Sequence, residues 1–211
     1  MTRIPYQIAD EAAAKITKKI HQKFRHNRLA LFDEMNVIQT KKHINKLYKS
    51  VYQIIKKEFV KVLNPISEVI YTEALEVGFD GDIRELDEGF IEEFFEEYNP
   101  VTKYVFNNEI NRKNSRLFES IVASTQERYQ SYKTAENLIN KQVKQYAIDL
   151  EDKVAMAVYK DVGVEKVMWF AEDDYKTCSV CNALDGEIFG LLDAPPKQHY
   201  NCRCVLIPVK D

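Results

Sequence analysis

The four cysteines of this 211-residue chain all lie in its last quarter, and they are the feature that most constrains its fold. They are Cys178, Cys181, Cys202 and Cys204, and His199 lies three residues before Cys202. The resulting pattern, C-x2-C-x17-H-x2-C-x-C, offers two groups of donors separated by a turn-rich segment. Zinc takes four thiolate or imidazole donors in a tetrahedron. The pattern therefore predicts a small module that is stabilised by a metal ion.

The spacing leaves open which four of the five donors bind the ion. A C-x2-C turn presents two sulfurs to one ion, and His199 with Cys202 provides a second pair of matching spacing. Cys202 and Cys204 share one face of an extended strand, so they form an alternative pair. We prefer Cys178, Cys181 and Cys202, then His199, then Cys204. Two other interpretations remain, in which the cysteines are small buried apolar residues or form disulfides.

The composition favours a helical protein made in the cytosol. Hydrophobic residues are 45% and charged residues 30% of the chain, and the six glycines and six prolines are few for a fold rich in turns. No apolar run approaches the roughly 18 residues that cross a bilayer. The first residues lack the apolar region of a secretion signal. Thiols stay reduced in the cytosol, which favours metal binding over disulfides.

Apolar residues spaced by three and four predict amphipathic helices over most of the first 161 residues. Asn64-Pro65 and Asn99-Pro100 resemble a helix cap followed by proline at the first helical position, so each pair predicts a new helix. Gly163 fits a left-handed helix end. The helices expected from these signals cover 6–31, 37–63, 65–77, 83–98, a long segment from 100, and 134–161.

From Lys166 onward the pattern changes to short strands. Alternation in KVMWFAE, the segment DGEIFG and the final VLIPV each predict one strand. A module of about 45 residues is too small to bury a sufficient apolar core, which again favours a metal. We predict a mainly α fold, with a helical N-terminal bundle and a small α+β, zinc-ribbon-like C-terminal module. The predicted domains are 1–163 and 164–211; the first comprises a variable partner-binding part, 1–98, and long helices, 99–163.

Charge is distributed unevenly along the chain. Residues 1–61 carry 14 Lys/Arg against 5 Asp/Glu, a balance of +9, whereas residues 62–99 carry 1 Arg against 12 Asp/Glu, a balance of −11. The basic part is expected to contact nucleic acid, the acidic segment of the same chain, or a partner protein. Solvated helix faces of different sign are the simpler alternative. The candidate binding residues are Lys41, Lys42, Lys46, Lys49, Lys56 and Lys57.

The cysteine region lacks the partners that catalysis would need. The chain has no H-x-E of zinc deaminases and no H-E-x-x-H of zinc proteases. His199 follows Gln198, not the aspartate that an HNH-type nuclease requires, and there is no phosphate-binding glycine loop. Nearby acidic residues are interpreted as turn and solvent groups. We predict a structural metal in a protein that is not an enzyme; a divergent metal-dependent nuclease is the less favoured alternative.

The C-terminal stretch resembles the phage Mu protein F-like family of minor head, or head morphogenesis, proteins. The resemblance covers roughly residues 99–207 and includes the upstream segment NPVTKYVFNNEINRK. Besides the cysteines and His199, it rests on Trp169, Asp173, Asp174, Leu184, Asp185, Gly186, Pro195, Pro196 and Arg203.

The resemblance implies a structural minor head protein of a tailed double-stranded DNA phage or prophage. Such proteins are associated with the portal protein in the capsid interior, after assembly in the host cytoplasm, and some are thought to contact DNA. The implied partners are the portal, other head proteins and double-stranded DNA, with no membrane and no small-molecule substrate. Arg203 would orient its loop or pair with Asp173 or Asp174.

Overall fold

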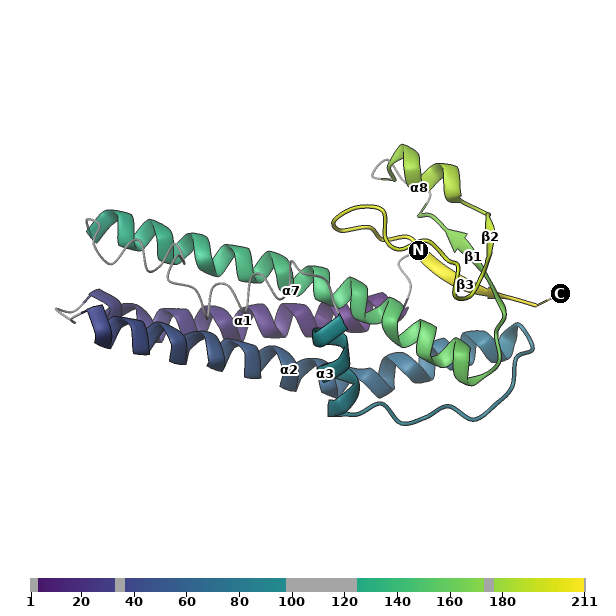
Figure 1. The fold of residues 1–211 in the computed structure, drawn as a ribbon, viewed down its shortest axis with the longest axis horizontal. Coiled ribbons are helices and arrows are strands. Elements are labelled where there is room, and N and C mark those ends of the chain that lie inside the picture. The colour runs from purple at the N-terminus through teal and green to yellow at the C-terminus, as the bar shows by residue number, and fades with distance from the viewer. Residues whose placement is uncertain (1–3, 33–36, 98–124, 173–176, 211) are drawn as a thin grey trace. The chain divides into compact units, whose positions relative to one another are not determined.

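Helices dominate the chain, and a small three-stranded antiparallel sheet follows them (Figure 1). The computed structural model describes residues 4–32, 37–97, 125–172 and 177–210. None of the helices within these ranges is long and apolar enough to cross a membrane. The elements in chain order are α1 (Ile4–Phe32), α2 (Val37–Glu76), α3 (Glu88–Glu97), α7 (Thr125–Asp161), β1 (Lys166–Phe170), α8 (Ser179–Leu184), β2 (Ile188–Gly190) and β3 (Val205–Val209).

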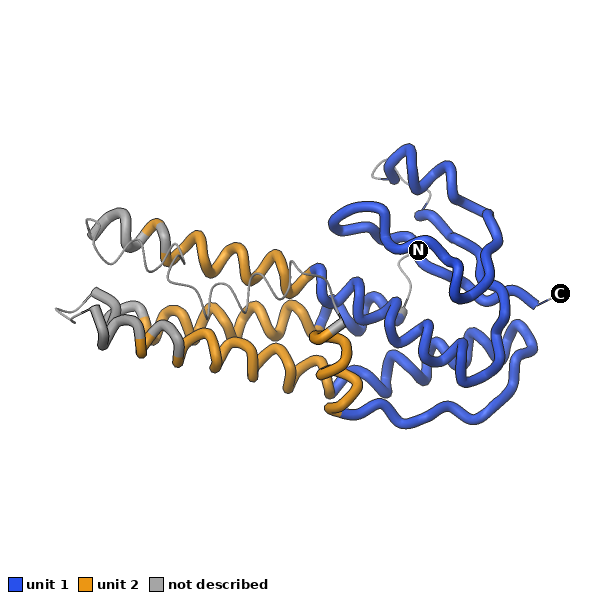
Figure 2. The backbone as a smooth tube through the Cα atoms, viewed as in Figure 1, with its two compact units in different colours: residues 1–11, 61–87, 145–211 blue, residues 12–60, 88–144 orange. Residues whose placement is uncertain are grey.

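The chain divides into two units, each made of segments that are distant in sequence (Figure 2). Unit 1 comprises residues 1–11, 61–87 and 145–211, and unit 2 comprises residues 12–60 and 88–144. The strands and the second half of α7 therefore belong to the same unit. The predicted division of the sequence at residue 163 stays a prediction.

In unit 2, parts of α1, α2, α3 and α7 bury their apolar stripes together. The rings of Phe24 in α1 and Tyr132 in α7 lie 4.8 Å apart, and those of Tyr52 in α2 and Phe95 in α3 lie 5.6 Å apart. The predicted spacing of three and four explains this burial, because it places these side chains on one face of each helix. Further buried residues of this unit are Ile16, Ile20, Leu47, Val51, Ile55, Phe59, Phe94, Ile139 and Val143.

The prediction that a new helix begins at Pro65 is wrong, because α2 continues through this proline to Glu76. Asn64 does not act as a helix cap. Its side chain accepts a hydrogen bond from the Leu86 N–H (2.9 Å) and donates one to the Leu86 carbonyl (3.1 Å). Pro65 is exposed, so its ring meets solvent rather than a packed neighbour. The burial of Ile66 and Ile70 beyond it provides packing that offsets the missing backbone bond.

Two further helix boundaries differ from the predictions. The acidic helix α3 begins at Glu88 instead of Ile83, since residues 83–87 are held outside a helix by side chains: Asn64 accepts the Leu86 N–H and Asp161 accepts the Arg84 N–H (3.2 Å). Helix α7 begins at Thr125, before the predicted start at residue 134. The predicted long helix from residue 100 lies outside the described residues as far as residue 124. Helix α1 agrees with the predicted 6–31 within two residues.

Gly163 ends the α7 segment as predicted, with a φ of 75°. The Val164 N–H donates to the Tyr159 carbonyl (2.8 Å), the hydrogen bond typical of a Schellman helix end. The chain then enters β1, the central strand of a sheet with the order β2-β1-β3. All three predicted strands are confirmed. In β1, Val167 and Trp169 are buried and alternate with more exposed residues, so one face of the sheet forms the core of the small module.

Candidate metal centre

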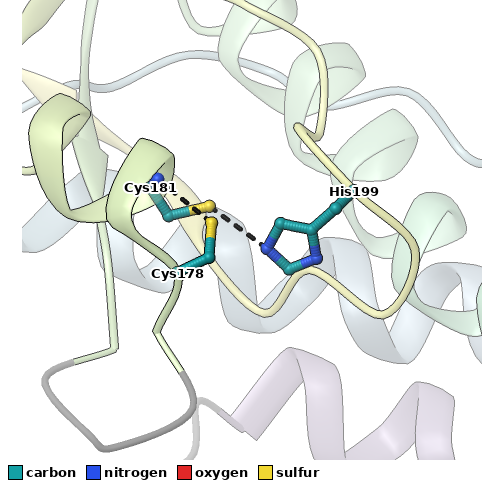
Figure 3. Close-up of side chains that lie close together, drawn as sticks. All are labelled: Cys178, Cys181 and His199. Atoms are coloured by element: carbon teal, nitrogen blue, oxygen red, sulfur yellow. Dashed lines mark hydrogen bonds between the residues drawn. The ribbon is translucent and has the colours of Figure 1, made fainter.

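The local structure of α8 brings the first two donors together. Cys178 is the N-cap of α8, with extended backbone angles, and its Sγ accepts a hydrogen bond from the Cys181 N–H (3.4 Å). A cap residue and the third residue after it lie on the same side of the first helical turn. Both sulfurs therefore face the segment that carries His199 (Figure 3). The sequence did not predict α8, which is only six residues long.

The ring of His199 is oriented as a metal ligand would be. Its Nδ1 lies 3.0 Å from the carbonyl oxygen of Tyr200, and its Nε2 lies 3.4 Å from the Sγ of Cys181 (Figure 3). A carbonyl oxygen only accepts hydrogen bonds, so Nδ1 carries the proton in a neutral ring. The lone pair is then on Nε2, the atom that faces the sulfur. A hydrogen bond of this kind from the second nitrogen is typical of metal-binding histidines.

The remaining cysteines complete two overlapping groups of three donors. Cys178, Cys181 and His199 form one, and Cys181, Cys202 and Cys204 form the other, with all donor atoms within 4.8 Å in each group. The Sγ atoms of Cys181 and Cys202 are 3.5 Å apart. Thiolates bound at about 2.3 Å to a tetrahedral zinc ion lie about 3.8 Å from each other, whereas disulfide sulfurs lie about 2.05 Å apart. The donors are thus close enough to hold a metal ion, and the four cysteines are free thiols.

The cluster is packed into the core of the module. Trp169, Ala171, Cys181, Cys202 and Cys204 are all buried in contact with one another, with Phe189 and Leu206 at the margin. Burial raises the pKa of the Cys181 and Cys204 thiols, because a thiolate is poorly solvated there. The pKa of Cys178 is lowered, chiefly by the Cys181 N–H that donates to its sulfur. A metal cation bound there would favour the thiolate forms of these cysteines.

Polar residues of α7 hold the loop that carries three of the five donors. Lys197, whose side chain is 10% exposed, places its Nζ 3.1 Å from Asp152 and also donates to the Cys204 carbonyl. Gln145 accepts the Asn201 N–H (2.7 Å), at a residue with a φ of 59°. Burial by itself would lower the pKa of Lys197, but the Asp152 and then other negative groups outweigh it, so the pKa is raised.

Sequence analysis missed these anchors. A lysine in PPKQH and polar residues within an amphipathic helix resemble ordinary surface groups, and only their burial distinguishes them. The donors of unit 1 are thus supported by a second layer of polar residues on α7. Such supporting layers fix the orientation of ligands in metal sites generally.

The residues of the family motif have structural positions around the cluster. The Asp185 carboxylate accepts the Ala171 N–H (2.8 Å), and Gly186, with a φ of 78°, donates its N–H to the Trp169 carbonyl (2.9 Å). Pro196 is exposed, and its carbonyl accepts a hydrogen bond from the side chain of Gln198. Arg203 lies 3.5 Å from the Glu172 carboxylate. Asp173 and Asp174, its predicted partners, lie outside the described residues.

The candidate lysines of α2 differ in their surroundings. Lys42, Lys46, Lys49 and Lys57 are exposed, while the side chain of Lys41 lies outside the described part. Lys56 is buried, and its ammonium binds the carboxylates of Glu88 (2.5 Å) and Glu92 in α3. The predicted contact between the basic part and the acidic segment of the same chain is therefore present at Lys56.

The fold and the site define a class: a mainly helical protein that carries a small module with five clustered Cys and His donors. Residues 116–207 match the family described as Phage Mu protein F like protein, which confirms the resemblance found in the sequence. The match covers less than half of the chain.

A curated relative from Haemophilus influenzae (strain ATCC 51907 / DSM 11121 / KW20 / Rd) is described as an uncharacterized protein. It is 36% identical to this chain over 67 residues, which are 29% of this chain and 15% of the relative. The chain therefore spans only a small part of that protein. No solved structure matched.

Proposed function

We propose that this chain is a structural minor head protein of a tailed double-stranded DNA phage or prophage and acts in head morphogenesis. The observation that carries the proposal is the family match over residues 116–207, in the region that holds all five donors. The match covers the cysteine module and α7, the helix to which the module is anchored. The assembly role of the family is therefore assigned to this part of the chain.

The module is proposed to be held together by one structural zinc ion. Cys178, Cys181, His199 and Cys202 are the proposed ligands, and Cys204 is the donor left over. Cys181 supports this choice, since its sulfur lies 3.4 Å from His199 Nε2 and 3.5 Å from Cys202 Sγ. Zinc would supply folding free energy, which in small modules is of the order of 10 kcal/mol. No catalytic role is proposed for the site.

The metal proposal is tested on the full chain, purified without chelator, by zinc analysis and by Co²⁺ absorption. Cys204→Ser should retain one zinc per chain and the cobalt spectrum of a site with three sulfurs and one nitrogen. His199→Gln should weaken binding and shift the spectrum. Zinc retention by His199→Gln with loss in Cys204→Ser would show that the four cysteines are the ligands. A wild-type chain without zinc, with an unchanged fold in EDTA, would overturn the metal site.

The proposed partners are the portal protein and other head proteins, and the proposed location is the capsid interior, after assembly in the host cytoplasm. The test uses the phage or prophage that encodes the chain. An affinity-tagged chain should copurify with portal protein and be present in purified particles, and deletion of its gene should reduce the yield of filled heads. Complementation with Cys181→Ser should fail, whereas Ser179→Ala on the exposed side of α8 should restore heads. A chain absent from both particles and portal complexes would refute the proposal.

A further inference from the structure

A groove in unit 2 is lined by lysines of α1 and α2 and lies outside the residues that match the family. Its volume is about 650 Å³. Lys42, Lys46 and Lys49 line it from α2, and Lys23 lines it from α1. Ser50, Gln53 and Ile54 also line it, and none of the described lining residues carries a carboxylate.

The spacing of the α2 residues explains how the groove becomes basic along its length. Lys42, Lys46, Lys49 and Gln53 follow each other by four, three and four residues, which places them on one face of the helix. With a rise of 1.5 Å per residue, Lys42 and Lys49 are about 10 Å apart along the helix axis, which corresponds to about three phosphate-to-phosphate steps along the axis of one DNA strand. The lysines therefore present a row of positive charges whose length is comparable to a short run of DNA phosphates.

The lysines of this row differ from neighbouring lysines in their ion pairs. Within the described parts of the chain, none of the four groove lysines has an ion-pair partner, whereas Lys56 binds two carboxylates and Lys19 binds Glu58 (2.8 Å). The pKa of the neighbouring His43 is lowered by burial and then by the positive charge of Lys46. The groove therefore gathers four lysine charges, while Lys19 and Lys56 are paired with carboxylates.

The chemistry of the lining favours phosphates over carboxylates or bases. Lysine ammoniums act as point charges and suit the phosphate backbone, while planar recognition of carboxylates or base edges relies mainly on arginine. Among the described residues that line the groove, none has an aromatic ring on which a base of a single strand could stack. Gln53 adds a neutral side-chain amide that can donate to phosphate oxygens, while the Ser50 hydroxyl already donates to the Lys46 carbonyl (2.9 Å).

We propose that the groove lined by Lys23, Lys42, Lys46 and Lys49 binds the phosphate backbone of double-stranded DNA without sequence preference. This inference does not depend on the metal centre. Four phosphate contacts give a slope of about −3.6 in log K against log salt, so affinity should fall about 150-fold between 50 and 200 mM salt.

The test measures binding of the full chain to a labelled duplex of arbitrary sequence by fluorescence anisotropy. One variant changes Lys42, Lys46 and Lys49 to Gln, and a charge-matched control changes Lys18, Lys133 and Lys144 to Gln. The control lysines are exposed in the same unit and do not line the groove. Circular dichroism and thermal unfolding show whether each variant is folded.

The groove variant should bind at least ten-fold more weakly at low salt and lose most of the salt slope, while the control stays within about three-fold of the wild type. Equal losses in both variants would assign binding to overall charge and overturn the proposal. Binding of poly-glutamate but not of the duplex would assign the groove to an acidic protein and refute the DNA assignment. A groove variant that still enters heads and binds zinc separates this result from the proposed assembly role.

Discussion

The buried ion pair between Lys197 and Asp152 offers a direct test of how α7 supports the metal centre. Its Nζ and Oδ1 atoms are 3.1 Å apart, and the two side chains are 10% and 27% exposed. Replacing Asp152 by Asn leaves the ammonium buried without this carboxylate. Breaking a fully buried pair costs about 3–5 kcal/mol and an exposed pair at most about 1 kcal/mol. Because Asp152 is partly exposed, the expected loss of unfolding free energy lies between these two limits, at about 2–3 kcal/mol.

The loss should also appear in metal affinity, because Lys197 fixes the loop that carries His199 and Cys202. If the whole effect falls on the folded, metal-binding form, 2–3 kcal/mol corresponds to a loss of about 30- to 150-fold in zinc affinity. Trp169 is the only tryptophan of the chain and packs against the cysteines, so its fluorescence reports on this cluster alone. Urea unfolding and chelator competition, both followed at Trp169, measure the two quantities.

A double-mutant cycle separates the ion pair from general damage. Asp152→Asn combined with Lys197→Met should be less destabilised than Asp152→Asn alone, because no charge then stays buried. Glu165→Gln, which changes an exposed carboxylate of the same unit, is the control and should stay within about 0.5 kcal/mol of the wild type. If Asp152→Asn behaves like this control, or the double variant shows no recovery, the anchoring role of α7 is refuted.

Two further changes test the helical part. Gly163→Ala should destabilise the protein by about 1 kcal/mol in thermal unfolding, because the φ of 75° strains an L-residue although a Cβ would meet no atom within 4 Å. An unchanged transition would contradict the left-handed helix end. Lys56→Met should cost about 1–2 kcal/mol in urea unfolding, since it removes the contacts with Glu88 and Glu92. Those contacts raise the pKa of Lys56 above its value of about 10.4 in the unfolded chain. The stability cost of Lys56→Met should therefore be equal at pH 6 and pH 9, because both lie below the unfolded pKa. A cost that disappears at pH 9 would refute this pairing.

Sequence spacing was sufficient for the features that depend on local geometry. The apolar stripes of the helices, the left-handed end at Gly163 and the three strands were predicted, because each follows from the period of the backbone or from one residue's φ. The clustering of the five donors also followed from the sequence. The same local rules failed at Asn64-Pro65, where the asparagine binds Leu86 instead of capping a helix.

The sequence by itself determined that this chain is mainly helical, that it carries a Cys/His module, and which residues are the candidate ligands. Tertiary structure decided which lysine is buried beside carboxylates and which lysines line a groove, since residues distant in sequence create both environments. It also decided that Lys197 and Gln145 anchor the ligand loop to α7. Burial and long-range partners depend on how elements pack together, and residue spacing along one element does not contain that information.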